Sequence, residues 1–218
     1  MDADDLLVQL VSDFTTSQDN ARFVGAFYRS INEAQSWLCN KRGGMWGFQM
    51  VLDATVSTVD GTRSVSLPAT FRTLINNKCV RDTTNGTQLT FITLKEWWDR
   101  EYEDGSTEGE PSLYWVVGKT MYFSPIPDDA YTIKYSYYRL PAAISANAKT
   151  LLVPDEYEEL ILSRTARALK KRGFSSFDDI ILETTDEAEL LRDAIHDDNM
   201  RYRAARAGLQ RSTHTSRH

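Results

Sequence analysis

Hydrophobic positions in the first 44 residues follow the spacing of helices. Residues 3–14 carry apolar side chains three and four positions apart, which predicts a first helix. A polar break follows, and Ser17 or Asp19 is suited to cap a second helix. The apolar stripe of this second helix consists of Phe23, Phe27, Ile31, Ala34 and Leu38. We expect the helix to run to about the last of these residues, and the pair Gly43-Gly44 to end it.

Residues 45–140 change to the alternation that is typical of β-strands. Three dipeptides with strong turn propensity, Asp60-Gly61, Asn85-Gly86 and Gly118-Lys119, each separate two such stretches and predict hairpins. The last hairpin should have a type II′ turn, because glycine occupies its first central position. The expected strands lie at 50–56, 63–67, 78–83, 88–93, 113–117, 120–124 and 131–140. In the last strand, alternate residues from Tyr131 to Tyr137 share one face.

An acidic stretch interrupts this β region at 94–110, with seven acids against Lys95 and Arg100. We expect one short helix over 94–102, which carries Trp97 and Trp98, and a polar loop after it.

Helical patterns return after a linker at 141–149. Pro154 stands in the first turn of a third helix, where its missing N–H costs nothing, and Gly173 ends that helix. A heptad seam marks a long fourth helix: Phe177, Ile181, Thr184, Ala188, Leu191 and Ile195, resuming at Tyr202, Ala205 and Leu209. Either the core of the same chain or a neighbouring copy covers this seam. For the second case the interface residues are Ile181, Ala188, Leu191, Ile195 and Tyr202.

These patterns predict an α+β fold. N-terminal helices and long C-terminal helices form a helical bundle, and a central antiparallel β unit of about five to seven strands forms a sandwich or a barrel-like structure. The expected parts are an N-terminal helical segment at 1–44, a β domain at 45–140 with the acidic insertion 94–110, C-terminal helices at 150–207 that pack with 1–44, and a flexible basic tail at 208–218.

Composition sets broad limits on the class of protein. With 41% hydrophobic and 26% charged residues, the chain of 218 residues is typical of globular proteins. Its apolar runs stay well short of the roughly 18 residues that a membrane-spanning helix needs. The acidic start of the chain argues against a secretory signal peptide, which is basic. A formal net charge of −6 disfavours general adhesion to nucleic acid, because phosphates repel it.

The charge is distributed unevenly, and the C-terminal end is basic. Residues 201–218 contain no acid and five arginines: Arg201, Arg203, Arg206, Arg211 and Arg217. Such a segment is either a solvated end or an arm that docks on an acidic surface.

No constellation of residues predicts catalysis, a metal or a cofactor. Gly118-Lys119-Thr120 resembles the end of a phosphate-binding loop, but Leu113 stands where that loop needs glycine. His196-Asp197 resembles a pair of metal ligands without the further ligands that a metal requires, and two cysteines, Cys39 and Cys79, cannot build a metal cage. The pairs Glu101/Glu103 and Glu108/Glu110 imitate the two carboxylates of a glycosidase, but they sit in a polar stretch and a solvated loop is the better explanation.

The order of ordinary motifs across residues 66–160 carries a resemblance that no single motif does. It runs from Pro-Ser-Leu-Tyr through a short hairpin, Pro-x-Pro, a tyrosine-rich strand and a linker to a helix that begins Pro-x-Glu-Tyr. The stretches are Ser66–Arg72, Gly109–Trp115, Met121–Asp128, Tyr131–Tyr138 and Val153–Tyr157. In this order the chain resembles the head-to-tail adaptor, or connector, proteins of bacteriophages.

The resemblance implies a structural virion protein at the head-to-tail junction, assembled in the host cytoplasm. About twelve copies would form a ring under the portal protein, continue the channel for double-stranded DNA without reading its sequence, and present a platform to a tail or nozzle protein. It implies no catalytic residues, no cofactor and no membrane. By position, the basic segment Arg201–His218 becomes the candidate for portal binding, and Glu101, Glu103, Asp104 and Glu108 become the candidate tail-facing residues.

Two other functions remain open at this point. A tail-associated hydrolase would use a carboxylate pair of the acidic insertion, and glutamine replacements at those positions would abolish its activity. A DNA-binding regulatory protein would contact phosphates through the arginine-rich end, and it would shift DNA mobility at low salt.

Overall fold

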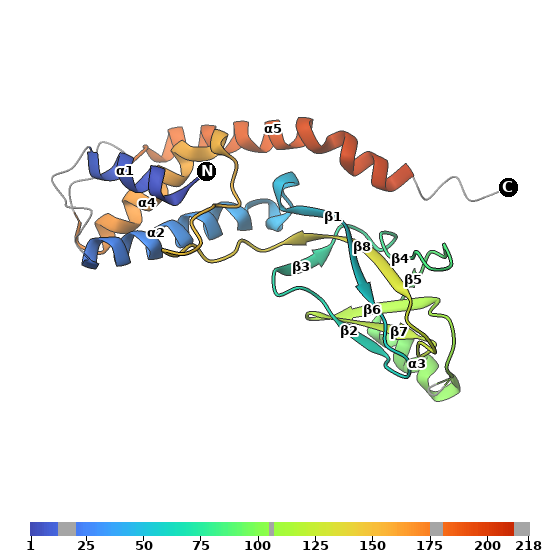
Figure 1. Cartoon of the computed structure of the whole chain (residues 1–218). Helices are drawn as coiled ribbons and strands as arrows, with labels where there is room; N and C mark the ends of the chain where they lie inside the picture. The colour runs from blue at the N-terminus through green and yellow to red at the C-terminus, as the bar shows by residue number, and fades with distance from the viewer. Residues whose placement is uncertain (13–20, 105–106, 175–180, 212–218) are drawn as a thin grey trace. The chain divides into compact units, whose positions relative to one another are not determined.

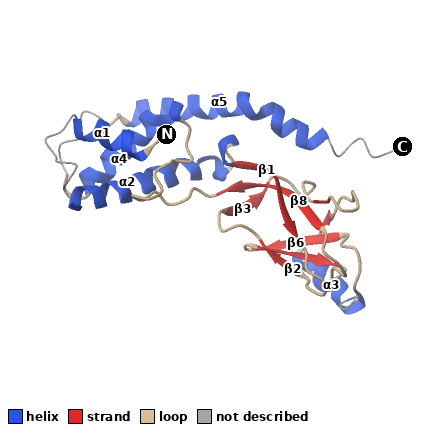
Figure 2. Cartoon of the chain, in the orientation of Figure 1, coloured by secondary structure: helices blue, strands red, loops and turns tan. Residues whose placement is uncertain are grey.

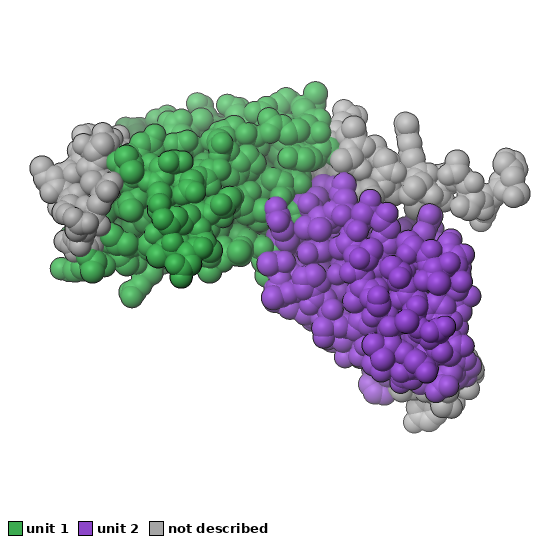
Figure 3. Space-filling view, in the orientation of Figure 1, with its two compact units in different colours: residues 1–49, 140–207 green, residues 50–139, 208–218 purple. Residues whose placement is uncertain are grey.

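The computed structural model describes residues 1–12, 21–104, 107–174 and 181–211 (Figure 1). Most helices fall into one part of the chain, and the strands lie in the other together with a single helix, α3 (Leu94–Asp104), among the described residues (Figure 2). The chain divides into two compact units: unit 1 comprises residues 1–49 and 140–207, and unit 2 comprises residues 50–139 and 208–218 (Figure 3). The combination of helices with mostly antiparallel sheets confirms the predicted α+β class.

Unit 1 is helical. Its elements are α1 (Ala3–Ser12), α2 (Ala21–Asn40), α4 (Glu158–Lys171) and α5, which runs from Thr184 to Arg211, with short 3₁₀ turns at Lys41–Gly44, Gly47–Gln49 and Asp155–Tyr157. Helix α2 pairs closely with α4. The predicted caps Ser17 and Asp19 lie outside the described residues.

The apolar stripe of α2 forms the centre of this unit's core, as its spacing predicts. Phe23, Phe27, Ile31, Ala34 and Leu38 are all buried, and they belong to one cluster with residues of α1 and α4. The helix ends just before Gly43 and Gly44, whose φ angles of 68° and 74° lie in the left-handed region that glycine adopts without strain. Gly173, with φ 87°, follows α4 in the same way.

Unit 2 contains two four-stranded sheets that share one core. Its strands are β1 (Met50–Ser57), β2 (Ser64–Ser66), β3 (Phe71–Leu74), β4 (Arg81–Asp82), β5 (Thr90–Phe91), β6 (Leu113–Val117), β7 (Thr120–Ser124) and β8 (Thr132–Arg139). The first sheet has the order β1-β8-β3, with β4 also paired to β8, and the second has the order β2-β7-β6-β5. Within the described residues neither sheet closes, so the barrel-like alternative is wrong. The strands pair antiparallel except β5 with β6, and the described residues form eight strands rather than five to seven.

The hairpin predicted at Asp60-Gly61 forms its turn but not its strand pair. Val59 and Thr62 bridge across the turn, and Gly61 has φ 67°. However, β1 pairs with β8, and β2 pairs with β7. The eight-residue β8 offers β1 a long partner that buries Ile133 and Tyr135, whereas β2 has only three residues. Turn propensity acts locally and does not select the partner of a strand.

The two later turns occur where their dipeptides predict them. Strands β6 and β7 match the expected bounds, and Gly118 has φ 60°, as the first central position of a type II′ turn requires. At the Asn85-Gly86 turn, Arg81 and Gln88 form an antiparallel bridge, but the flanking strands are only two residues long. They separate at once, because β4 joins β8 and β5 joins β6.

Helix α3 (Leu94–Asp104) confirms the short helix that was expected in the acidic insertion. The long C-terminal helix α5 has 28 residues but begins at Thr184, and Phe177 of the predicted seam lies outside the described residues. Cys39 and Cys79 are both free thiols. Among the described residues, no helix is long and apolar enough to cross a membrane.

Candidate functional site

Buried polar groups fasten α5 to the start of the 3₁₀ turn Gly47–Gln49. The Asp198 side chain is fully buried, and its Oδ1 accepts a hydrogen bond of 2.7 Å from the backbone N–H of Gly47. One turn further along α5, the Tyr202 ring lies so close to Gly47 that a Cβ there would stand 1.9 Å from ring atom Cδ2. Glycine at position 47 therefore lets the tyrosine ring pack directly on the backbone.

The same stretch of α5 makes two further contacts with the segment that precedes α4. Arg201 forms an ion pair with Glu156, and this hydrogen-bonded pairing raises the pKa of the arginine. The Tyr157 hydroxyl donates to the carbonyl of Ala194 at 3.4 Å. Together with the Asp198 contact, these interactions hold α5 in place from Ala194 to Tyr202.

Burial of Tyr157 makes the stability of this anchor sensitive to alkaline pH. Burial raises the pKa of Tyr157 to about 12, and the neighbouring carboxylates of Asp198 and Glu156 add to the effect. An unfolded tyrosine ionises near pH 10, so the stabilisation is complete below about pH 10 and is lost as the pH rises toward 12.

We therefore expect the midpoint temperature of thermal unfolding to decrease as the pH rises from about 10 to about 12. The fall should be shallower for Tyr157→Phe, which has no hydroxyl to ionise. Thermal unfolding of both proteins between pH 8 and pH 12 measures this difference, and equal slopes would contradict the assignment.

Of the five candidate portal-binding arginines, only Arg201 has a side chain that the structure describes. Arg201 is engaged with Glu156, so its first role is to anchor α5. Arg203, Arg206 and Arg211 belong to α5, but their side chains lie outside the description, as does the whole of Arg217.

The candidate interface residues of the heptad seam are mostly turned to the chain's own core. Ile181, Leu191 and Ile195 are partly buried and pack against the core cluster of unit 1. Ala188 is exposed, and Tyr202 covers Gly47. The most deeply buried residues described on α5 are instead Glu187, Ala194 and Asp198. The hydrophobic pattern misses two of them because they are acidic. Asp198 falls on the seam between Ile195 and Tyr202, whereas Glu187 lies one position before Ala188 and no sequence pattern points to it.

Glu187 neutralises part of a cationic groove between α2 and α4. Its carboxylate is only 7% exposed, pairs with Arg164, and lies 3.2 Å from Arg167. The Arg164 guanidinium also lies over the ring of Trp37, with its carbon 3.9 Å from the ring centroid. Such pairing is needed, because a charge buried without a partner costs several kcal/mol (about 3–5).

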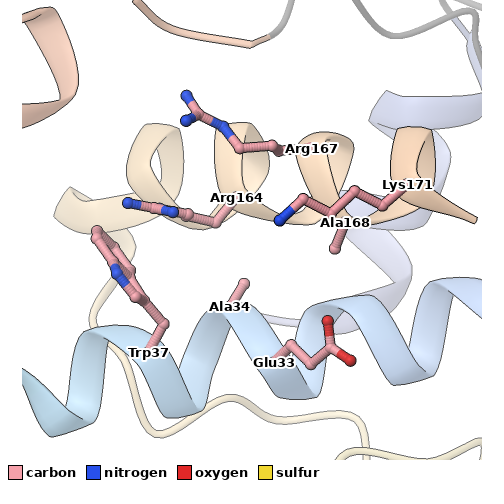
Figure 4. Close-up of a pocket in the computed structure, with 7 residues that line it drawn as sticks. All are labelled: Glu33, Ala34, Trp37, Arg164, Arg167, Ala168 and Lys171. Atoms are coloured by element: carbon pink, nitrogen blue, oxygen red, sulfur yellow. The ribbon is translucent and has the colours of Figure 1, made fainter. Parts of the chain in front are cut away.

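Figure 4 shows how the groove is built: Trp37, Ala34 and Glu33 come from α2, and Arg164, Arg167, Ala168 and Lys171 come from α4. Small side chains from both helices, Ala34 and Ala168, form its floor. Glu33 is paired with Arg172, beyond the groove. Two of the three lining cations therefore remain in excess over Glu187.

Helix α3 displays an apolar stripe, which consists of Leu94 and Trp98, on the surface of unit 2. Its start is fixed by a capping box: the Thr93 N–H donates to Glu96 Oε2 at 2.6 Å, and the Glu96 N–H donates to Thr93 Oγ1 at 3.2 Å. Trp97 stacks on Trp115 of β6 with ring centroids 4.8 Å apart. Its neighbour Trp98 is 56% exposed.

Of the candidate tail-facing residues, only Glu108 has a described side chain, and it is exposed. Glu101, Glu103 and Asp104 lie on the last turns of α3, where side chains are not described. The exposed stripe of α3 was not identified from the sequence, because Trp97 and Trp98 are identical residues and only packing distinguishes them.

The motifs that imitate catalytic sites have structural explanations. Lys119 lies in the turn between strands β6 and β7 and donates to the carbonyl of Ala69, whereas a phosphate-binding loop connects a strand to a helix. His196 is exposed on α5. Across the described ranges, no three metal-ligating side chains come together.

Comparison with known proteins places the chain in a family. A family model described as SU10 adaptor protein matches residues 1–215, almost the whole chain. No curated protein matches the chain. Members of this family are structural adaptors of bacteriophage particles, which fits the prediction of a non-enzymatic role. The chain belongs to the SU10 adaptor protein family, in agreement with its resemblance to bacteriophage head-to-tail adaptors.

Proposed function

We propose that this protein forms a ring of about twelve copies at the head-to-tail junction, where it docks under the portal and presents a platform to the tail. The observation that carries the proposal is the family match over residues 1–215. The ring continues the channel for double-stranded DNA, and it assembles in the host cytoplasm before it becomes part of the virion.

The arrangement of α5 supports portal docking through the C-terminal segment. Asp198, Arg201 and Tyr202 are all engaged within unit 1, so they give the segment that follows a fixed starting point. Beyond Tyr202 the chain carries Arg203, Arg206, Arg211 and Arg217 and no acid. These charges favour an acidic surface on the portal, because opposite charges steer association and fix register.

The acidic insertion of unit 2 is the part we assign to the tail. Glu101, Glu103 and Asp104 lie on the last turns of α3, and Glu108 is exposed beyond them. The overall negative charge of each copy suits a DNA channel. A ring whose copies each carry −6 repels phosphates and lets DNA pass without binding it tightly.

Mass measurement of the purified protein, alone and mixed with its portal, tests this proposal. We expect the portal complex to gain about twelve copies of the chain. The protein alone reports whether the ring forms before docking or only on the portal. A protein that stays single-copy in both samples, and is absent from purified particles, would overturn the proposal.

A further inference from the structure

The surface of α3 has the features of a binding hot spot. Leu94 and Trp98 lie four residues apart on the helix and are 47% and 56% exposed. A large exposed aromatic on a rigid element is the kind of residue that dominates the energy of an interface. The capping box at Thr93 and the stacking of Trp97 supply this rigidity. The exposure of Trp98 is therefore not a result of loose packing.

The charge of α3 restricts what kind of surface can cover it. Its sequence contains five acids against two bases, and the described pair Lys95–Asp99 at 3.8 Å neutralises one of each. A surface that covers Trp98 must therefore carry positive charge around an opening with an apolar floor. Like charges placed across an interface would oppose binding.

The groove between α2 and α4 has both of these properties. Ala34 and Ala168 give it a floor of small side chains, and Trp37 gives it an aromatic wall. Arg164, Arg167 and Lys171 line it, and Glu187 offsets only one of these three charges. Arginines next to an open groove are also suited to stack on an incoming indole ring.

We propose that α3 of one copy docks through Leu94 and Trp98 into the α2–α4 groove of a second copy of this chain. The two surfaces are different parts of one chain, so the contact is heterologous and continues from copy to copy until it closes as a ring. This inference rests on the proposed ring and names the contact that builds it. Leu94 and Trp98 lie in the first half of α3, and three of the candidate tail-facing residues lie on its last turns, so one helix would contact both a neighbouring copy and the tail.

Photo-crosslinking in assembled particles tests the contact directly. We would place p-benzoylphenylalanine at position 98 of the full-length chain and, as a matched control, at Val117, which is 47% exposed on β6. The expected product has the mass of two chains. In it, position 98 of one copy is linked to residues 33–37 or 164–171 of a second copy. Position 117 should give no link to these residues.

The outcomes separate this inference from the proposed function. A link from position 98 to the tail or portal protein, a link within one chain, or no link in particles that contain the protein would overturn the contact and leave the adaptor role intact. Particles that lack the protein would instead overturn the adaptor role.

A mixing experiment with two full-length variants tests the heterologous geometry. Trp98→Ala removes the docking side chain, and Lys171→Glu reverses a charge of the groove; both positions are exposed, so we expect both variants to fold. Each alone should assemble on the portal at least about tenfold more weakly than the natural protein, a loss of about 1.4 kcal/mol per contact. An equal mixture should recover pairs but no rings, because each pair contains one intact contact. Full rings from either variant alone would overturn the contact.

Discussion

Deletion of residues 204–218 is expected to weaken docking on the portal by about 100-fold, while the helical core of unit 1 and the sheets of unit 2 keep their fold. The deletion removes Arg206, Arg211 and Arg217, which supply most of the positive charge after α5 leaves its anchor. The described contacts of α5 with unit 1 end at Tyr202, so they all remain. Attachment of the truncated and full-length proteins to purified heads, measured at several salt concentrations, gives the ratio.

A variant that keeps the length but not the charge identifies which property matters. The triple change Arg206→Gln, Arg211→Gln and Arg217→Gln should lose most of the docking that the deletion loses, and the remaining affinity should depend less on salt. Circular dichroism and thermal unfolding check that the fold is unchanged. If the truncated protein attaches to heads as well as the full-length protein does, the C-terminal segment is not the portal contact.

Gly47→Ala should destabilise unit 1 by about 2–3 kcal/mol or more, because the added methyl group meets the Tyr202 ring in a packed site. The new Cβ would lie 1.9 Å from the ring, a separation that forces the ring or the backbone to move. Movement of either also strains the hydrogen bond from the Gly47 N–H to Asp198. Urea unfolding followed by tryptophan fluorescence measures the change, because Trp46 is buried beside this site.

Two matched variants give this prediction its controls. Gly25→Ala adds the same methyl group in α2 where nothing lies within 4 Å, and it should stabilise the chain by about 0.5–1 kcal/mol through better helix propensity. The double change Gly47→Ala with Tyr202→Ala should recover most of the loss of the single change, since the clashing ring is gone. Equal effects of Gly47→Ala and Gly25→Ala would show that Tyr202 does not pack on position 47.

The anchor at Gly47 and the C-terminal arginines together describe how an adaptor can combine a rigid body with a docking segment. The polar contacts of Asp198 and Arg201 lie on α5 shortly before the C-terminal segment begins. A force that a partner applies to this segment therefore acts on these two contacts first. Loss of these contacts should therefore weaken docking even when every arginine is retained, because the C-terminal segment would lose more conformational entropy when it binds.

Elements that depend on nearby residues could be predicted from the sequence. The stripe of α2 from Phe23 to Leu38 is buried throughout, and the hairpin at Gly118 has the expected strands. In both cases the period of hydrophobic residues or the conformation of one glycine determines the structure locally. The family resemblance could be recognised for the same reason, because it consists of such local motifs in a fixed order.

Strand pairing and the role of each aromatic residue could not be predicted in this way. Turn propensity at Gly61 predicts that β1 pairs with β2, yet β8 offers β1 a longer partner from the far end of the unit. Trp97 and Trp98 are adjacent in sequence, and only the position of Trp115 leaves the first ring half-buried and the second exposed. Competition between distant partners decides both outcomes.

By itself, the sequence determined the α+β class, the positions of most helices and turns, the acidic insertion, the basic C-terminal end and the adaptor family. Only the tertiary structure decided that Glu187 and Asp198 of α5 are buried and that a cationic groove lies between α2 and α4. The physical reason is the distance along the chain between partners: Glu187 needs Arg164, 23 residues away, and Asp198 needs Gly47, 151 residues away. A buried charge is tolerated only where folding brings a partner next to it. A local pattern of hydrophobic and polar residues cannot identify a partner that is distant along the chain.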